Sequence, residues 1–203
     1  MDLSNFQSTA YGGVDITSEI VRQWRDLGVK KAIFRLPNYY DKERALHEVI
    51  FFAQVGVCKW EGMPIETYQW AYLGNDPVRQ IEYARSILGK VALLEQRCWL
   101  DLEEQTTKSR ASVRDFIKAS LVLPNMGIYT GRGWWEEVFG VSGGFEDKPL
   151  WDASWVGDGK DPITIPPLNE GFVPYGGWVS RAMRQYGYCV LGGVTVDVNV
   201  YRA

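Results

Sequence analysis

The chain has 203 residues, 46% hydrophobic and 23% charged, which is typical of one globular domain with a continuous core. This composition excludes a disordered or fibrous protein. The net charge is -3 and the sequence has no cluster of Lys and Arg, which argues against a nucleic-acid partner. The content of 9 Trp, 11 Tyr and 8 Phe is high, and it suggests a surface for a flat ligand as well as a core.

The N-terminal residues, MDLSNFQSTAYGG, have neither the basic nor the apolar region of a signal peptide, and no segment is long enough to span a bilayer. We therefore expect a soluble protein that is made in the cytoplasm and does not insert into membranes. The single His47 is interpreted as a surface or packing residue. We expect no disulfide framework, metal or cofactor, because no His cluster accompanies the three separate cysteines, Cys58, Cys98 and Cys189.

Strand and helix periods alternate along the first part of the chain. The first strand is expected at 13–16, and a helix follows it from an N-cap at Thr17 or Ser18 to Gly28. The second strand is expected at 31–36, and the next helix ends at Gly56. Apolar residues at helical spacing predict the buried face of that helix: Leu46, Val49, Ile50 and Ala53.

The alternation continues with a strand at 65–72 and a helix that begins at Asp76 and Pro77 and closes at Gly89. A fourth strand, a fourth helix and a fifth strand follow, after which segments rich in Gly, Trp and Pro replace long helices. Strand candidates in the second half lie at 98–103, 126–129, 149–155, 179–186 and 193–201. Eight candidates favour a closed, TIM-like α/β barrel. An open doubly wound sheet is the alternative, but the sequence lacks the nucleotide-binding glycine motif that is typical after the first strand of that fold.

Four acidic residues mark a candidate catalytic site, because active groups of such barrels lie at the C-terminal ends of strands. Asp15 is expected to end the first strand, Asp101 and Glu103 the fourth, and Asp197 lies within the apolar last strand. Asp101 and Glu103 share a strand face, and close carboxylates favour protonation of at least one of them. Such a pair suits glycoside hydrolysis. The structural alternatives are helix capping and buried ion pairs, and they weigh most for Asp15.

Several segments resemble, in order and spacing, those of the glycoside hydrolase family 25 lysozymes. The segments are GVDIT, WLDLEE, GIYTG, PLWDASW, QYG at 185–187 and VTVDVNVY. The resemblance spans nearly the whole chain and implies a (β/α)5β3 barrel, in which five strand–helix units precede three strands. We expect residues 1–203 to form one catalytic barrel without a cell-wall-binding module. The implied activity is cleavage of the β-1,4 bond between N-acetylmuramic acid and N-acetylglucosamine in bacterial peptidoglycan.

The resemblance also implies roles for individual residues. Glu103 corresponds to the general acid and Asp101 to its partner, while Asp15 and Asp197 line the groove. A direct carboxylate nucleophile and attack by the substrate's own acetamido oxygen both fit, and we favour the second. The expected sugar contacts are Tyr68, Trp70, Trp151 and Tyr186. The segments RLPNYYD and YQWAY depart from the family pattern, which affects the sugar contacts more than the chemistry.

Two other functions compete with the lysozyme hypothesis. A chitinase-like or N-acetylglucosaminidase activity would use a similar barrel, and a catalytically silent barrel could serve in wall binding or as a virion component. The presence of all four acids argues against the silent barrel. A lysozyme made in the cytoplasm without a signal peptide would need a holin-type release route or another partner to reach the wall.

Overall fold

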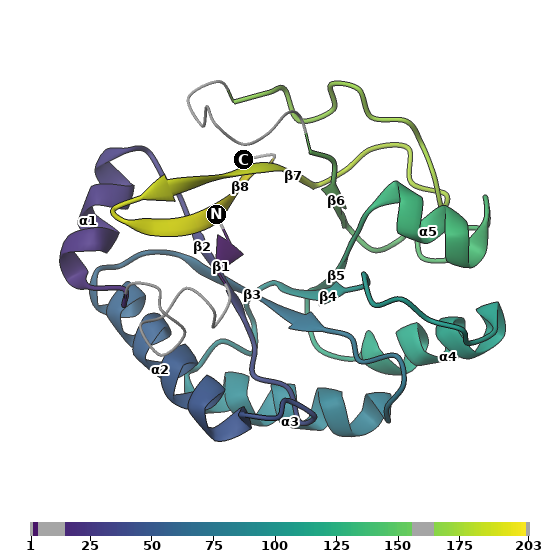
Figure 1. The fold of residues 1–203 in the computed structure, drawn as a ribbon, viewed down its shortest axis with the longest axis horizontal. Coiled ribbons are helices and arrows are strands. Elements are labelled where there is room, and N and C mark those ends of the chain that lie inside the picture. The colour runs from purple at the N-terminus through teal and green to yellow at the C-terminus, as the bar shows by residue number, and fades with distance from the viewer. Residues whose placement is uncertain (1, 4–14, 156–164, 202–203) are drawn as a thin grey trace.

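The computed structural model describes residues 2–3, 15–155 and 165–201, and for residues 2–3 it describes the backbone alone. Its eight strands close into a barrel in sequence order, and five helices precede the last three strands (Figure 1). Strands β1 to β7 are parallel, whereas β8 runs antiparallel to both β7 and β1. The expected (β/α)5β3 barrel is confirmed.

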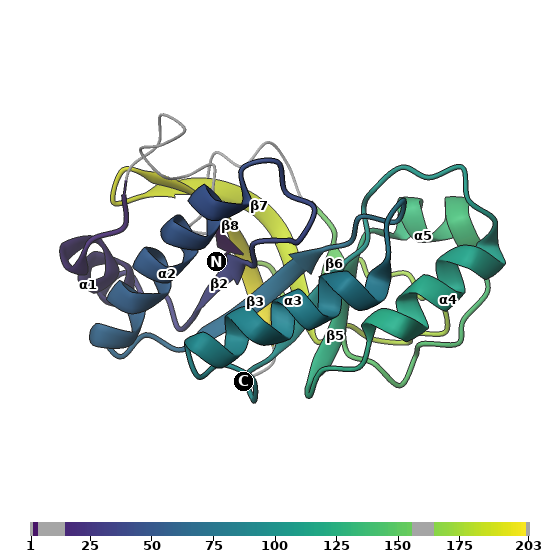
Figure 2. The ribbon, with the colours of Figure 1, turned by 90° about the horizontal axis from the view of Figure 1, so that it is seen from below.

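The strands are β1 (Asp2–Leu3), β2 (Ala32–Arg35), β3 (Ile65–Trp70), β4 (Cys98–Asp101), β5 (Met126–Thr130), β6 (Leu150–Ala153), β7 (Met183–Leu191) and β8 (Val194–Tyr201). The helices are α1 (Ser18–Asp26), α2 (Arg44–Trp60), α3 (Pro77–Lys90), α4 (Arg110–Ser120) and α5 (Arg132–Phe139). Figure 2 shows α4 beside α5 at one end of the molecule and α1 with α2 at the other. No helix among the described residues could cross a membrane.

Local sequence signals explain where the helices begin. The Thr17 side chain caps α1 by accepting from the backbone N–H of Ile20, as expected. Asp76 caps α3 in the same way, and Pro77 occupies its first turn, as predicted. The helix ends agree less well, because α2 continues through Gly56 and α3 through Gly89.

The prediction of a first strand at 13–16 is wrong. Asp15 and Ile16 have no regular structure and lead directly into α1, and residues 13 and 14 lie outside the described part of the chain. The first barrel strand is β1, whose Asp2 pairs with Ile33 of β2 and with Asp197 of β8. A strand of two residues is too short for the period-two pattern that reveals strands.

The predicted buried face of α2 is wrong in part: Ile50 is buried and Leu46 half-buried, but Val49 and Ala53 are exposed. The face that packs on the barrel comprises His47, Ile50, Phe51, Gln54, Val55 and Cys58. Two polar residues belong to this face, so the apolar residues alone suggested the wrong phase. Helix α5 is implied by the family resemblance but does not appear in the apolar pattern, because its eight residues bury only Trp135 and Phe139.

Side chains of alternate strand residues fill the barrel interior. A cluster of aromatic and aliphatic side chains packs there, separate from the core between strands and helices: Ile33, Trp99, Tyr129, Trp151 and Met183. Gly127 faces this cluster, and a Cβ atom at that position would lie 2.4 Å from the Trp99 ring. Glycine is therefore required where the Trp99 indole crosses β5.

Candidate active site

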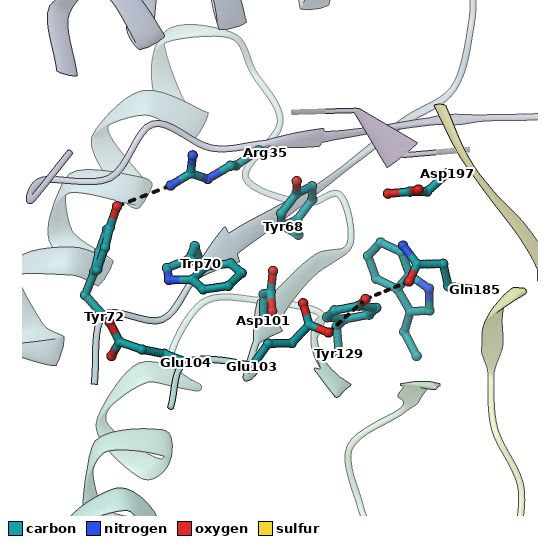
Figure 3. Close-up of a pocket in the computed structure, with 11 residues that line it drawn as sticks. Arg35, Tyr68, Trp70, Tyr72, Asp101, Glu103, Glu104, Tyr129, Gln185 and Asp197 are labelled. Carbon is teal, nitrogen blue, oxygen red and sulfur yellow. Dashed lines mark hydrogen bonds between the residues drawn. The ribbon is translucent and has the colours of Figure 1, made fainter. Parts of the chain in front are cut away.

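The site is a pocket of about 550 Å³ in the barrel (Figure 3). Its walls come from strands β2 to β8 and from residues just beyond their ends. The lining residues are Arg35, Tyr68, Trp70, Tyr72, Asp101, Glu103, Glu104, Tyr129, Trp151, Gln185 and Asp197. This set contains three of the four predicted catalytic acids and three of the four predicted sugar contacts.

Strand register explains why these residues meet. Asp101 is paired with Trp70 on one neighbouring strand and with Tyr129 on the other. Tyr129 is in turn paired with Trp151. Paired residues of adjacent strands lie on the same face of a sheet, so this row of side chains points into the barrel together.

The three acids approach the pocket from different strands. Asp101 is the last residue of β4 and is 3% exposed, while Glu103 lies two residues further and is half-buried. Asp197 comes from β8, and Figure 3 shows it across the pocket from Asp101 and Glu103. The structure therefore brings together these three predicted acids, whose sequence separation spans almost half of the chain.

Asp15 does not belong to this group. It is exposed, lies immediately before α1 and is not among the described residues that line the pocket. The acid that the backbone places opposite Asp197 is Asp2 of β1. Sequence periodicity could not identify it, because the strand that carries it has two residues.

Hydrogen bonds connect Glu103 to the far side of the pocket. The Tyr129 hydroxyl lies 3.3 Å from Glu103 Oε1 and 2.7 Å from Gln185 Oε1 (Figure 3). The indole Nε1 of Trp155 donates to the same Gln185 oxygen at 3.1 Å. Tyr129 and Gln185 are buried, so bulk water does not compete for these bonds.

The aromatic residues divide into accessible and buried groups. Tyr68 and Trp70 are half-buried and line the pocket as predicted. Trp151 also lines the pocket but is 1% exposed, packs against Tyr129 at 4.5 Å between ring centroids and donates to Asn199 Oδ1. It forms the floor of the pocket and offers no free face to a sugar.

The expectation for Tyr186 is wrong. The residue follows Gln185 on β7, and successive strand residues point to opposite faces. Gln185 enters the pocket, whereas Tyr186 is 7% exposed and joins the core between the strands and the helices. A sugar in the pocket could not contact its ring.

Arg35 is the one basic residue among the described residues that line the pocket. Its Nη2 donates to Asp41 Oδ1 at 3.1 Å and to the Tyr72 hydroxyl at 3.4 Å. Burial opposes the charge of Arg35, but Asp41 and the nearby tyrosines raise its pKa above the ordinary value. A fixed guanidinium therefore faces a pocket whose other acidic or basic lining residues, among those described, are all Asp or Glu.

Glu104 was not predicted as a site residue. Its Oε2 accepts from the Leu73 N–H, and its carbonyl oxygen accepts from Trp134 Nε1 at 3.0 Å. These two hydrogen bonds connect the segment after β4 to the segment after β3 on one side and to α5 on the other. Glu104 therefore fixes the backbone next to Glu103, and no sequence pattern distinguishes it from an exposed glutamate.

The cysteines do not provide a nucleophile or a metal site. All three are buried, and burial raises the pKa of the Cys58 thiol to about 12 and that of Cys98 to about 11. Within residues 2–3, 15–155 and 165–201, no group of three or more His, Cys, Asp or Glu side chains could hold a metal ion. The carboxylates, tyrosines and Gln185 are thus the polar groups available for chemistry in the pocket.

Comparisons with known proteins agree with this architecture. The fold is similar to that of the catalytic domain of endolysin ply40 from bacteriophage P40 of Listeria monocytogenes, with a TM-score of 0.69 and 18% identity over 100% of this chain and 92% of that domain. A probable GH family 25 lysozyme 3 from Dictyostelium discoideum is 29% identical over 110 residues, which are 50% of this chain and 22% of that protein. The chain thus spans about a fifth of that relative's length.

The resemblance to lysozymes predicted from the sequence is confirmed by a family comparison. The model of the family described as lysozyme-like protein 1 matches residues 39–186, which include β3 to β6, Asp101, Glu103 and most of the pocket. This segment is well over half of the chain. The chain therefore belongs to the lysozyme-like protein 1 family.

Proposed function

We propose that the protein is a peptidoglycan hydrolase that cleaves the β-1,4 bond between N-acetylmuramic acid and N-acetylglucosamine. Glu103 is its general acid and Asp101 assists at the reacting sugar, while Asp197 lines the opposite wall. Membership of a lysozyme-like family supports the class of reaction. A pocket that combines acids with accessible aromatic side chains supports a carbohydrate substrate.

The hydrogen-bond directions around Tyr129 carry the assignment of Glu103. An indole N–H can only donate, so the Gln185 atom that faces Trp155 Nε1 is the amide oxygen. That oxygen can only accept, so the Tyr129 hydroxyl donates its single proton along the 2.7 Å contact to Gln185. The hydrogen bond from the same hydroxyl to Glu103 Oε1 is longer, at 3.3 Å, and therefore weaker. Tyr129 therefore gives the Glu103 carboxylate only a weak hydrogen bond, which supports Glu103 as the group that carries the proton for the general-acid step.

A protonated carboxyl group in the pocket is what the first step of glycoside hydrolysis requires. Glu103 transfers its proton to the glycosidic oxygen as the bond from that oxygen to the anomeric carbon breaks. The acetamido carbonyl oxygen of the same sugar attacks the anomeric carbon, and Asp101 accepts a hydrogen bond from the acetamido N–H. Water then opens the ring intermediate and returns a proton to the Glu103 carboxylate, which restores the starting state.

A zymogram of purified bacterial cell walls, with Glu103→Gln beside the wild type, tests this proposal. The wild type should clear the gel, and the variant should lose at least about 100-fold in rate, because general acid catalysis contributes that much or more. Glu82→Gln, at an exposed position on α3, is the matched control and should clear like the wild type.

The products identify the bond. N-acetylmuramic acid at the new reducing end supports the proposed cleavage, whereas N-acetylglucosamine at that end would indicate the competing glucosaminidase activity. Equal clearing by wild type and Glu103→Gln would refute the role of Glu103. No clearing by wild type would favour a catalytically silent barrel.

A further inference from the structure

Two aromatic side chains stand exposed beside the pocket without belonging to it. Trp155 is 48% exposed and Tyr188 is 42% exposed, and their ring centroids lie 5.9 Å apart. Trp155 lies two residues beyond the end of β6, and Tyr188 belongs to β7. Packing in the core does not account for either ring, because each leaves a large part of its aromatic surface exposed to solvent.

A β-bulge turns Tyr188 toward the pocket side of β7. Gln185 is paired with Asn199, Gly187 with Val198, and Tyr188 with Asp197, so one extra residue lies between Gln185 and Gly187. Without the bulge, Gln185 and Tyr188 would point to opposite faces. With it, Tyr188 shares a face with Asp197, which lines the pocket.

The next residue on this face extends the apolar surface away from the pocket. Val190 is 64% exposed, and its partner Thr195 is exposed as well. The opposite face of the hairpin is buried in the core through Cys189, Val194 and Val196. We call Trp155, Tyr188 and Val190 the hairpin shelf.

The hairpin shelf is held in place from behind. Trp24 of α1 donates from Nε1 to the carbonyl oxygen of Leu191 at 3.1 Å, close to the hairpin turn. At Gly192, a Cβ atom would lie 3.0 Å from Gln23 Oε1, which shows how closely the turn rests on α1. Figure 1 shows the β7–β8 hairpin reaching over α1. A surface fixed in this way loses little conformational entropy when a ligand binds.

We propose that the hairpin shelf is a saccharide subsite, which binds a sugar of the glycan strand beyond those at the cleaved bond. This inference rests on the proposed hydrolase function. The shelf residues carry no charge, and sugar rings present apolar C–H faces that pack on aromatic rings. Trp155 is hydrogen-bonded to Gln185, which lines the pocket. A glycan chain that leaves the pocket past Gln185 and Asp197 would therefore continue onto the hairpin shelf.

The dependence of cleavage on strand length tests the shelf. The substrates are glycan strands of alternating N-acetylglucosamine and N-acetylmuramic acid, prepared as tetrasaccharides and octasaccharides. Tyr188→Ser should lower kcat/KM for the octasaccharide by about three- to tenfold, the effect expected from one lost ring contact. The value for the tetrasaccharide should stay within about twofold. Trp60→Ser is the matched control and should cleave both lengths like the wild type. Trp60 is 83% exposed at the C-terminal end of α2, near the start of β3, whereas the pocket lies toward the other ends of the strands.

Binding to the inactive Glu103→Gln protein gives a second readout. The octasaccharide should shift the tryptophan fluorescence more than the tetrasaccharide does, and this difference should be largely absent when Trp155 is also replaced by Phe, because Trp70 in the pocket responds to both lengths. If Tyr188→Ser cleaves both lengths like the wild type, the shelf proposal is wrong while the hydrolase proposal stands. If wild type cleaves neither strand yet Glu103→Gln binds the octasaccharide through Trp155, the hydrolase proposal fails instead. Thermal unfolding confirms that each variant is folded.

Discussion

Gln185 lies between the solvent-exposed Trp155 and the hydrogen-bonded pair of Tyr129 and Glu103. Its amide oxygen accepts the shorter hydrogen bond from the Tyr129 hydroxyl, at 2.7 Å, which leaves Glu103 Oε1 with the weaker one at 3.3 Å. Gln185→Leu removes that acceptor, and the phenol proton then turns to Glu103 and stabilises its carboxylate. The basic limb of the kcat/KM profile should move to lower pH by about half a unit to one unit, the equivalent of one hydrogen bond.

Trp155→Phe separates the two roles that we assign to this residue. The variant keeps an aromatic ring on the hairpin shelf but loses the N–H that orients the Gln185 amide. Its pH profile should move in the same direction as that of Gln185→Leu, while its preference for long strands is retained. A basic limb that stays in place, or that moves to higher pH, in both variants would contradict the proposed proton arrangement.

The sequence predicted part of this residue-scale picture. Asp101, Glu103 and Asp197 were identified because an acid within an apolar strand is costly unless the fold uses it. Gln185 carries no such signal, and its role depends on the register between β6, β7 and β8. Tyr186 was predicted as a sugar contact from its place in a family motif, but it points to the face opposite Gln185 and joins the core.

At the scale of elements, the connection between β2 and α2 is organised around one buried carboxylate. Asp41 Oδ2 accepts from the Asn38 N–H at 2.7 Å and lies 2.9 Å from His47 Nδ1. Its Oδ1 accepts from Arg35 and from Tyr72. Burial alone would raise the pKa of Asp41, but Arg35 and these hydrogen bonds lower it below the ordinary value.

This lowered pKa predicts how stability depends on pH. Because the folded-state value lies below the unfolded one, Asp41 stabilises the fold fully above about pH 4 and loses this effect as pH falls through the folded pKa. Asp41→Asn should lower the free energy of unfolding by about 2 to 4 kcal/mol at pH 7. Urea unfolding at pH 7 and at pH 3 should show the difference from wild type shrinking at the lower pH. Asp26→Asn, at an exposed position, should show no such difference.

Helix phases were harder to predict than helix positions. On α2, His47 can lie on the buried face because its imidazole is hydrogen-bonded to Asp41. The pattern of apolar residues in the sequence does not reveal such a partner. The short α5 buries Trp135 and Phe139, a single i, i+4 pair that does not establish a helical period. The strands were recognised more reliably, since β3 alternates between buried and half-buried residues and β2, β4, β5 and β6 are runs of mostly buried residues.

For the whole molecule, the sequence predicted closure because it contains eight strand candidates, the first four of which are each followed by a helix. It could not show how the barrel is covered where helices are missing. Among the described residues no helix follows α5, and Figure 1 shows extended chain over the side of β6 and β7. Residues 165–182 therefore need another means of attachment, since they have no helical stripe to bury.

Arg181 provides that attachment. Its side chain is almost fully buried, forms an ion pair with Asp152 of β6, and donates to the carbonyl oxygens of Leu168 and Glu170. The Tyr175 hydroxyl donates to the second Asp152 oxygen at 2.7 Å. Burial and Asp152 raise the pKa of Tyr175, so this hydroxyl remains a donor. One guanidinium thus joins two carbonyl groups of the segment to Asp152 of the barrel.

Arg181→Met should lower the free energy of unfolding by about 3 to 5 kcal/mol in urea, because it leaves the Asp152 carboxylate buried without its cation. Adding Asp152→Asn should recover part of the loss, since the residual charge is removed. Lys148→Met is the matched control, because Lys148 pairs with the exposed Asp147 and such surface pairs contribute less than about 1 kcal/mol. If Arg181→Met costs no more than Lys148→Met, the segment is held by its apolar contacts with the core, and the ion pair does not replace the missing helix.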